Sequence, residues 1–287
     1  MNDQPKSAPD GIRRHVSTFH TLSRKALETF DKLISANAKE LTRPLHHLFL
    51  RMAYQAETTS QAARLLITYN LTIPALALIR VRLEQLIVCS YLIHEEKREG
   101  IEPFVHFIDI QEHLQMRVAV ANKAMAEHLT AVDFPLLEAK AIEAQQKLTP
   151  EFSPVTDRFQ RHWTPLDLHS MTKRRDVLAS SKTRIHKIKL ETCYVSVYKT
   201  LSSIVHSDCS SLSFNYIDLF ASNAGQVIMT TCPFWAAFGS NFCAMFDIIQ
   251  CYEILHFLGI DASEFETIVT EWQAARAEFA ANAERYP

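Results

Sequence analysis

The sequence predicts an all-α fold, a helical bundle of about seven to nine helices around an apolar central helix at about residues 73–95. Two observations predict it. The 287 residues include only 5 glycines, all isolated, which is too few for the turns of a β-sandwich. Their isolation also excludes the glycine-rich loops that bind dinucleotides and nucleoside triphosphates. Apolar residues recur at helical spacing along most of the chain, and no convincing segment alternates as a strand would.

The composition is that of an ordinary globular protein, with 47% hydrophobic and 22% charged residues. The 30 lysines and arginines nearly balance 32 acidic residues, so no global charge attracts nucleic acid or an anionic membrane. Residues 1–11 are polar with two prolines, and they predict a disordered tip instead of a signal peptide. Residues 12–287 then predict a single α-helical domain. The six cysteines lack CxxC spacing, which indicates reduced thiols and a cytoplasmic protein.

The helices of the first half follow from apolar periodicity and from residues that begin helices. One apolar stripe spans residues 41–52, and a second helix is expected to run on through Ala62, Leu65, Leu66 and Tyr69. Thr72 is a candidate N-cap for the central helix, which is apolar on almost every side and is therefore expected to be enclosed by its neighbours. Pro103 opens an amphipathic helix after it.

The second half is punctuated by prolines and one glycine. Residues 130–162 are less periodic and predict a short helix and a loop, whereas about 185–207 predict a long helix. Pro233 and Gly259 mark the two ends of another helix, and residues 263–266 form a capping box for the last one. Residues 227–246 carry no charge, and we interpret them as a buried core helix; a membrane span is the least favoured alternative.

The central helix carries two charges that point to a candidate site. Arg80 and Glu84 are four residues apart, so they lie about 40° apart on one helix face. Burying unpaired charges costs several kcal/mol, so both need a partner. They either form a structural ion pair that fixes the helix register, or they line a pocket in which Arg80 is presented to an anion. Arg82 points elsewhere and is expected to be exposed.

A polar stripe on the helix predicted at 185–207 gives the second candidate. Tyr194, Tyr198, Ser202 and His206 follow one another at intervals of four, so the last three lie within about 80° on one face. A histidine beside hydroxyl groups can transfer protons near neutral pH, which makes His206 a candidate general acid and base. The alternative is structural: tyrosines packed in the core, and a histidine favoured by the helix dipole.

A basic segment leads into this stripe. Between residues 173 and 189, lysines and arginines outnumber a single acid, Asp176. They either form a solvated face or bind the backbone of a nucleic acid. The candidate nucleic-acid contacts are Lys173, Arg174, Arg175, Lys182, Arg184 and Lys187. His106, Asp109 and His113 have a spacing that could hold a metal, but no fourth ligand accompanies them, so we expect no metal and no other cofactor.

The order of these motifs resembles a known family. The segment Leu78–Glu84 followed by Tyr91-Leu92 is similar to one helix of an all-helical bacterial family, domain of unknown function 5677. The similarity covers roughly residues 42–258 and implies a helical fold without an established activity. Further matching segments are Phe104–Asp109, His162-Trp163 with Met171, and Tyr194 and Tyr198 with Ser202–Ser207.

A more distant resemblance is to the HEPN superfamily, the higher eukaryote and prokaryote nucleotide-binding domains. These helical bundles are often dimeric, and many are metal-independent ribonucleases of toxin–antitoxin and phage-defence systems. Their hallmark is an arginine and a later histidine on a late helix, with four to six residues between them. Here Lys199 takes the place of that arginine, with six residues between it and His206, so the resemblance implies that Arg80 would supply the phosphate contact.

Two hypotheses therefore compete. In the first, a metal-independent ribonuclease or nucleotide-handling effector of the toxin or phage-defence type binds RNA or a nucleotide as a homodimer. His206 transfers protons, Arg80 stabilises phosphate charge, Glu84 orients Arg80, and Tyr198 and Ser202 position the substrate. In the second, the chain is a non-enzymatic helical sensor or protein-interaction module, and its polar residues form a buried network. Neither hypothesis expects a membrane.

Overall fold

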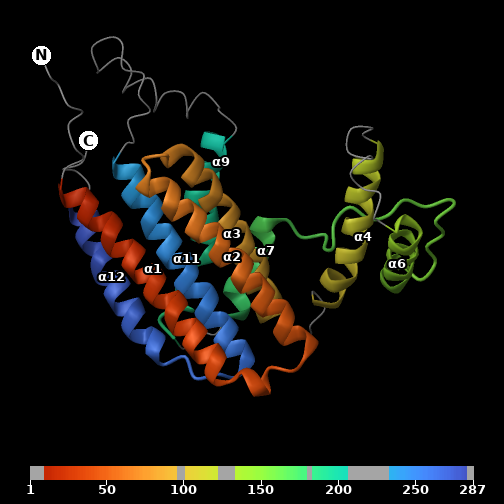
Figure 1. Ribbon diagram of the computed structural model, residues 1–287, viewed down its shortest axis with the longest axis horizontal. Coiled ribbons are helices and arrows are strands. Elements are labelled where there is room, and N and C mark those ends of the chain that lie inside the picture. Colours follow the sequence, from red (N-terminus) through yellow and green to blue (C-terminus); the bar gives the residue numbers. More distant parts are fainter. Residues whose placement is uncertain (1–9, 96–100, 122–132, 180–182, 206–232, 283–287) are drawn as a thin grey trace, which may run out of the picture. The chain divides into compact units, whose positions relative to one another are not determined.

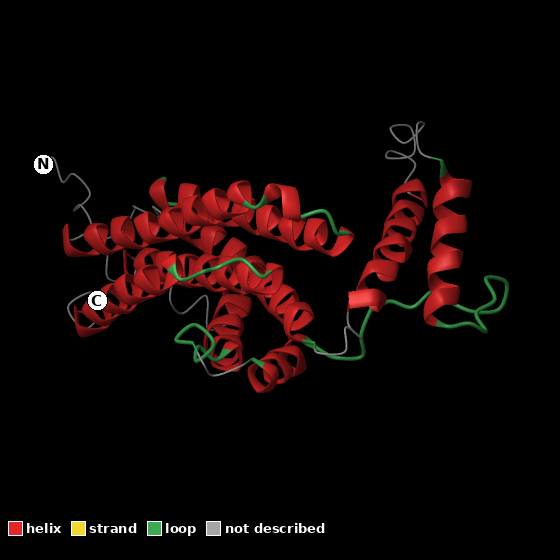
Figure 2. Cartoon of the chain, turned by 90° about the horizontal axis from the view of Figure 1, so that it is seen from below, coloured by secondary structure: helices red, strands yellow, loops and turns green. Residues whose placement is uncertain are grey.

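The computed structural model describes residues 10–95, 101–121, 133–179, 183–205 and 233–282. Every regular element within these ranges is a helix, and none is a strand (Figures 1 and 2). The all-α bundle is therefore confirmed. Long periodic segments fold in this way because each helix buries one apolar stripe against its neighbours.

The chain groups into two compact units. The first contains residues 1–93 and 171–287, and the second contains residues 94–170. The single domain expected from residue 12 onward stays a prediction, as does the disordered tip, most of which lies outside the described residues. The first described helix, α1, already begins at Asp10.

The first unit holds most of the helices. The long helix expected at about 185–207 is divided into three short segments, because a π-helical segment, η2, lies between α8 and α9. The elements of this unit are α1 (Asp10–Ala36), η1 (Ala38–Glu40), α2 (Pro44–Thr68), α3 (Thr72–His94) up to its last residue, most of α7 (Leu168–Leu178), α8 (Leu190–Cys193), η2 (Tyr194–Tyr198), α9 (Lys199–Val205), α11 (Pro233–Leu258) and α12 (Glu264–Asn282).

Helix α11 is the most enclosed element of the first unit. It packs against α1, α2 and α12 (Figure 1), and its residues from Cys243 to Leu255 are all buried. Pro233 begins it, and Gly259 follows it with a φ of 74°, as expected for a glycine that ends a helix. No helix among the described residues is long and apolar enough to cross a membrane.

The apolar helix predicted at 73–95 is α3, and it packs closely on α11. A Cβ atom at Gly239 of α11 would lie 2.8 Å from Cδ1 of Ile79 and 3.2 Å from Cδ2 of Leu76. The absence of a side chain at Gly239 therefore lets the two helices approach. One side of α3 still reaches the surface, since Val81 is half-exposed, and this side carries the first candidate site.

The described residues of the second unit include two long helices and the irregular segment that follows the second of them. Helices α4 (Ile101–Ala121) and α6 (Phe134–Leu148) pack on each other. Asp133 caps α6 by accepting a hydrogen bond from the backbone N–H of Leu136. The core of the unit consists of Phe107, Ile110 and Ala144, covered by Leu114, Leu148, Phe159 and Trp163.

Candidate functional site

Arg80 and Tyr198 meet although they are 118 residues apart in sequence. Nη2 of Arg80 donates a hydrogen bond of 2.9 Å to Oη of Tyr198 and lies 3.2 Å from Oε1 of Glu84. The guanidinium also lies over the Tyr198 ring, 4.9 Å from its centroid. Three of the five predicted catalytic residues are thus in direct contact. We call Arg80, Glu84, Tyr194 and Tyr198 the Arg80 cluster.

The tyrosines of the Arg80 cluster lie on the π-helical segment η2. Their rings stack with centroids 4.7 Å apart and an interplanar angle of 15°. The hydroxyl groups of Ser196 and Thr200 donate to the carbonyl oxygens four residues earlier, at 2.6 and 2.8 Å, and such bonds often bend helices. π-helical turns are rare and frequently occur at functional sites. The π-helical segment therefore supports the interpretation of the Arg80 cluster as a candidate functional site.

The Arg80 cluster lies at the edge of the bundle, where its charged groups keep partial access to solvent. The side chains of Arg80 and Glu84 are 20% and 34% exposed. The hydrogen bond to Tyr198 is the main cause that raises the pKa of Arg80, so this group stays cationic. Its Nε atom is buried and has no hydrogen-bond partner among the described residues. An anion from solution would therefore be bound by the exposed part of the oriented guanidinium.

The remaining two candidates of the polar stripe are placed only in part. Ser202 is half-buried on α9, one turn after Tyr198, which keeps it on the same side of the helix. His206 lies outside the described residues, so its catalytic role stays a prediction.

The basic segment is divided between the surface and the core. Lys173, Arg174, Arg184 and Lys187 are exposed, and Lys182 lies outside the described residues. Arg175 is fully buried instead: it pairs with Glu253 and, at 2.9 Å, with Asp176. An arginine held in this way is not available to a nucleic acid, so the structure removes Arg175 from the expected contacts.

Arg82 is the second arginine whose environment differs from the expectation. It was expected to be exposed, and this is wrong: Arg82 is 1% exposed. Its Nε lies 3.2 Å from Oδ1 of Asp247, and its Nη1 donates to Gln250 at 2.6 Å. Asp247 also accepts hydrogen bonds from Ser60 at 2.6 Å and Arg64 at 3.2 Å. We call these residues the Asp247 network.

A third polar group lies further along α11. Glu253 is buried and accepts hydrogen bonds from Ser90 of α3 and from Arg175 of α7. No sequence pattern pointed to Glu253, because its partners Ser90 and Arg175 are distant in sequence and only the fold brings them to it.

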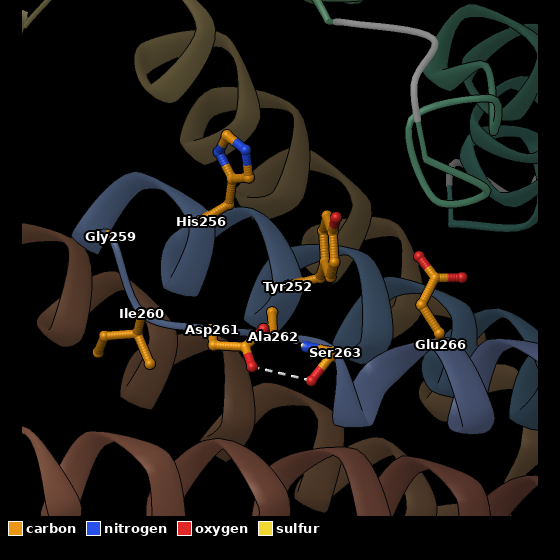
Figure 3. A pocket seen from close by; sticks show the side chains of 8 residues that line it. All are labelled: Tyr252, His256, Gly259, Ile260, Asp261, Ala262, Ser263 and Glu266. Carbon is orange, nitrogen blue, oxygen red and sulfur yellow. Dashed lines mark hydrogen bonds between the residues drawn. The ribbon is translucent and has the colours of Figure 1, made fainter.

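A pocket of about 460 Å³ opens where α11 turns into α12 (Figure 3). Tyr252 and His256 project from α11 into it, and Glu266 faces it from α12. On the turn between the helices, Asp261 accepts a hydrogen bond of 3.0 Å from the hydroxyl of Ser263. The pocket is therefore open and of mixed polarity, with the exposed imidazole of His256 at its rim.

The described cysteines are not candidates for nucleophilic chemistry. Cys89, Cys193, Cys243 and Cys251 are all buried free thiols. Burial raises the pKa of Cys193 to about 11 and that of Cys243 to about 12. Since the thiolate is the reactive form, these thiols are inert near neutral pH.

Comparison with known proteins gives a family but no activity. Residues 44–226 match the model of a family of unknown function, DUF5677. The match spans more than half of the chain and includes α3 and the whole Arg80 cluster. No curated protein and no solved structure matches the chain.

Proposed function

We propose a function for this chain, which belongs to the DUF5677 family of unknown function: it is a metal-independent RNA-cleaving or nucleotide-handling protein whose Arg80 binds a phosphate of the ligand. The observation that carries the proposal is a half-buried guanidinium held between Glu84 and Tyr198 beside a π-helical turn. A partly exposed guanidinium held in this way can meet an anion from solution while its partners keep it in place.

Arg80 is suited to a phosphate because its partners fix its plane. A planar guanidinium matches phosphate geometry through paired hydrogen bonds. Glu84 and Tyr198 both engage Nη2, so the group is oriented before a ligand arrives. Donors that are oriented in advance stabilise developing charge without having to reorganise, which is the largest single contribution in many enzymes.

The surroundings of Arg80 suit a nucleotide better than a simple anion. The stacked rings of Tyr194 and Tyr198 are of the kind on which bases pack in RNA-binding proteins. The exposed cations Lys173, Arg174, Arg184 and Lys187 precede this segment in sequence and would hold an RNA backbone. His206 would transfer the proton of a ribose 2′-hydroxyl, with Ser202 positioning the substrate.

The test is RNA cleavage in the presence of EDTA. The purified full chain is offered total RNA and tRNA, and the initial rate is compared with those of Arg80→Ala, Arg80→Lys and His206→Ala. We expect Arg80→Ala and His206→Ala to lose on the order of 100-fold in rate, as for removal of one charge-stabilising donor. Arg80→Lys keeps the charge but not the planar fork, so we expect it to recover only a small part.

The matched control is Arg51→Ala, an exposed arginine of α2, which should cleave like the natural protein. Intact RNA after incubation with the natural protein would overturn the ribonuclease proposal. Equal cleavage by Arg80→Ala and the natural protein would remove Arg80 from the site.

The alternative is a non-enzymatic helical sensor or protein-interaction module, and the buried polar groups on α11 favour it. Ser23 of α1 also donates a hydrogen bond to Asp247, so the Asp247 network joins α1, α2, α3 and α11, as a network that specifies one packing arrangement would. On this alternative no RNA is cleaved, and Arg80→Ala lowers the melting temperature by many degrees. A melting temperature within a few degrees of that of the natural protein, together with lost cleavage, favours the enzyme.

The partner and the compartment belong to the same proposal. The HEPN resemblance implies a homodimeric effector of the toxin or phage-defence type in the bacterial cytoplasm. Light scattering on the purified chain measures its oligomeric state directly. A mass of twice the chain mass of 32.8 kDa supports the homodimer. The mass of a single chain would contradict it.

A further inference from the structure

We propose that Asp176 of α7 is a positioning residue of the Arg80 cluster, because its carboxylate holds the start of the helix that carries the two stacked tyrosines. The two carboxylate oxygens of Asp176 accept hydrogen bonds from the backbone N–H groups of Leu190 and Glu191, at 3.1 and 3.0 Å. The consequence for catalysis rests on the proposed function, whereas the placement of the tyrosines does not.

The helix that begins at Leu190 has no capping side chain of its own. It runs without a break through α8, η2 and α9 to Val205. Its N-cap residue is Lys189, whose side chain makes no capping hydrogen bond. The first N–H groups of a helix need acceptors, and negative charge at this end is favoured by the helix dipole. Asp176 supplies both from a position 14 residues before Leu190.

Asp176 is itself held in place by a buried arginine. Its side chain is 7% exposed, and its Oδ1 also accepts a hydrogen bond of 2.9 Å from Nη1 of Arg175. The same Nη1 donates to the carbonyl oxygen of Ile188 at 2.9 Å, while Nη2 of Arg175 pairs with Glu253 of α11. Charged hydrogen bonds of this kind are the strong ones, so they tie the start of the helix to the most enclosed helix of the unit.

Apolar contacts alone do not fix the position of this helix along its axis, because burial of apolar surface is non-directional. The residues that form its buried face are Leu190, Cys193, Val197 and Leu201. Tyr198 lies eight residues after the start, or about 12 Å along an α-helical axis. A shift at the start is therefore carried to the hydroxyl group that meets Arg80 at 2.9 Å.

The π-helical segment makes the fixed start more important. Hydrogen bonds in a π-helical turn span five residues, whereas those of an α-helix span four. If η2 reverted to α-helix, the register of the helix on one side of it would have to change. Asp176 opposes this change at the start of the helix. It thereby preserves the stacking of Tyr194 and Tyr198, whose ring centroids lie 4.7 Å apart.

The experiment follows the Tyr198 ring by NMR in the full chain with isotope-labelled tyrosine. Tyr198→Phe identifies the resonance, and Tyr194→Leu gives the position that it takes without the stacked ring. We expect Asp176→Ala to move the resonance by at least half of the shift that Tyr194→Leu causes. The matched control is Asp133→Ala, which removes the carboxylate that caps α6 and should leave the resonance in its natural position.

A second substitution separates positioning from a general loss of stability. Lys189 is exposed and has the extended backbone of an N-cap residue, with φ of −83° and ψ of 114°. Lys189→Asp in the Asp176→Ala background supplies a local capping carboxylate, so the Tyr198 resonance should return toward its natural position. A variant that had only lost stability would keep the natural resonance in its folded molecules.

RNA cleavage is recorded in parallel. Asp176→Ala should lower kcat on the order of tenfold with little change in KM, as a misplaced charged group would, and Lys189→Asp should restore it. Intact RNA with the natural protein would overturn the proposed function alone, because the NMR measurement needs no activity.

Two results would overturn the positioning role of Asp176. One is a Tyr198 resonance that stays in its natural position in folded Asp176→Ala. The other is a resonance that moves but is not restored by Lys189→Asp. If Asp176→Ala does not fold, Asp176→Asn, which keeps one oxygen acceptor and loses the charge, is measured in its place by the same criteria.

Discussion

Arg80 and Arg82 are two residues apart on α3 and occupy opposite environments. Arg82 points into the bundle, is 1% exposed, and meets Asp247, Gln250 and the carbonyl oxygen of Phe246. Arg80 points to the edge and keeps 20% exposure, and among the described residues its polar partners are Glu84 and Tyr198. A step of two residues along an α-helix is a rotation of about 200°. This rotation alone places the two arginine side chains on opposite sides of α3. A buried arginine with all its partners supplied by the fold is structural, whereas a half-exposed one with spare donors is available to a ligand.

Breaking the Asp247 network should have the largest effect on stability. Asp247→Ala leaves Arg82 and Arg64 without their carboxylate, and removing one partner of a buried pair costs about 3–5 kcal/mol. For a chain of this size we expect the melting temperature to fall by roughly 10 °C. Differential scanning calorimetry or urea unfolding measures the loss.

The control for Asp247→Ala is Arg51→Ala on the exposed side of α2, which should change the free energy of unfolding by no more than about 0.5 kcal/mol. A similarly small change in Asp247→Ala would show that water replaces the carboxylate. The contrast between Arg82 and Arg80 would then lose its basis.

Mild acid should weaken the same region and spare the Arg80 cluster. Burial, with a smaller contribution from Arg64, lowers the pKa of His20 from 6.5 to about 4. His20 lies 3.0 Å from the hydroxyl oxygen of Ser240. Between these two pKa values the unfolded chain binds a proton that the folded chain does not, so stability falls as the pH decreases from about 6.5 to 4.

Replacing the titrating group tests this pH dependence. His20→Gln keeps a polar side chain but cannot titrate, so its free energy of unfolding should decline less steeply between pH 6.5 and 4. Urea unfolding at several pH values gives both slopes. Identical slopes in the variant and the natural protein would assign the acid sensitivity to other groups.

The sequence predicts the fold better than it predicts which charges are buried. Helical periodicity and isolated prolines locate α2, α3 and α11, because these features act over a few neighbouring residues. Helix α1 was not predicted, although Ile12, Phe19 and Phe30 form a spaced apolar stripe that is buried in the structure. Its polar intervening residues lower the average hydrophobicity and hide the pattern.

Buried charges are harder to predict because their partners are distant in sequence. Arg80 and Glu84 form a local pair that spacing reveals, and the contact with Tyr198 follows from two helices whose polar faces were both visible. For Asp247 the sequence reveals only that an acidic residue interrupts an apolar segment. Its partners Ser60 and Arg82 are brought to it by the packing of the helices. Arg175 illustrates the same limit, since its neighbours in sequence are exposed cations and its partner is Glu253.

Arg80→Ala should have the smallest effect on stability and so gives the sharpest test of the comparison. Partly exposed ion pairs contribute about 1 kcal/mol or less, so the melting temperature should fall by only a few degrees. Glu84→Gln, which removes the charge but keeps the size of its partner, should behave similarly. A loss as large as that of Asp247→Ala would make Arg80 a structural residue and favour the interaction-module alternative. A small loss of stability together with lost RNA cleavage would instead show that the two arginines have different roles. Arg82 would then be needed for folding, and Arg80 for cleavage.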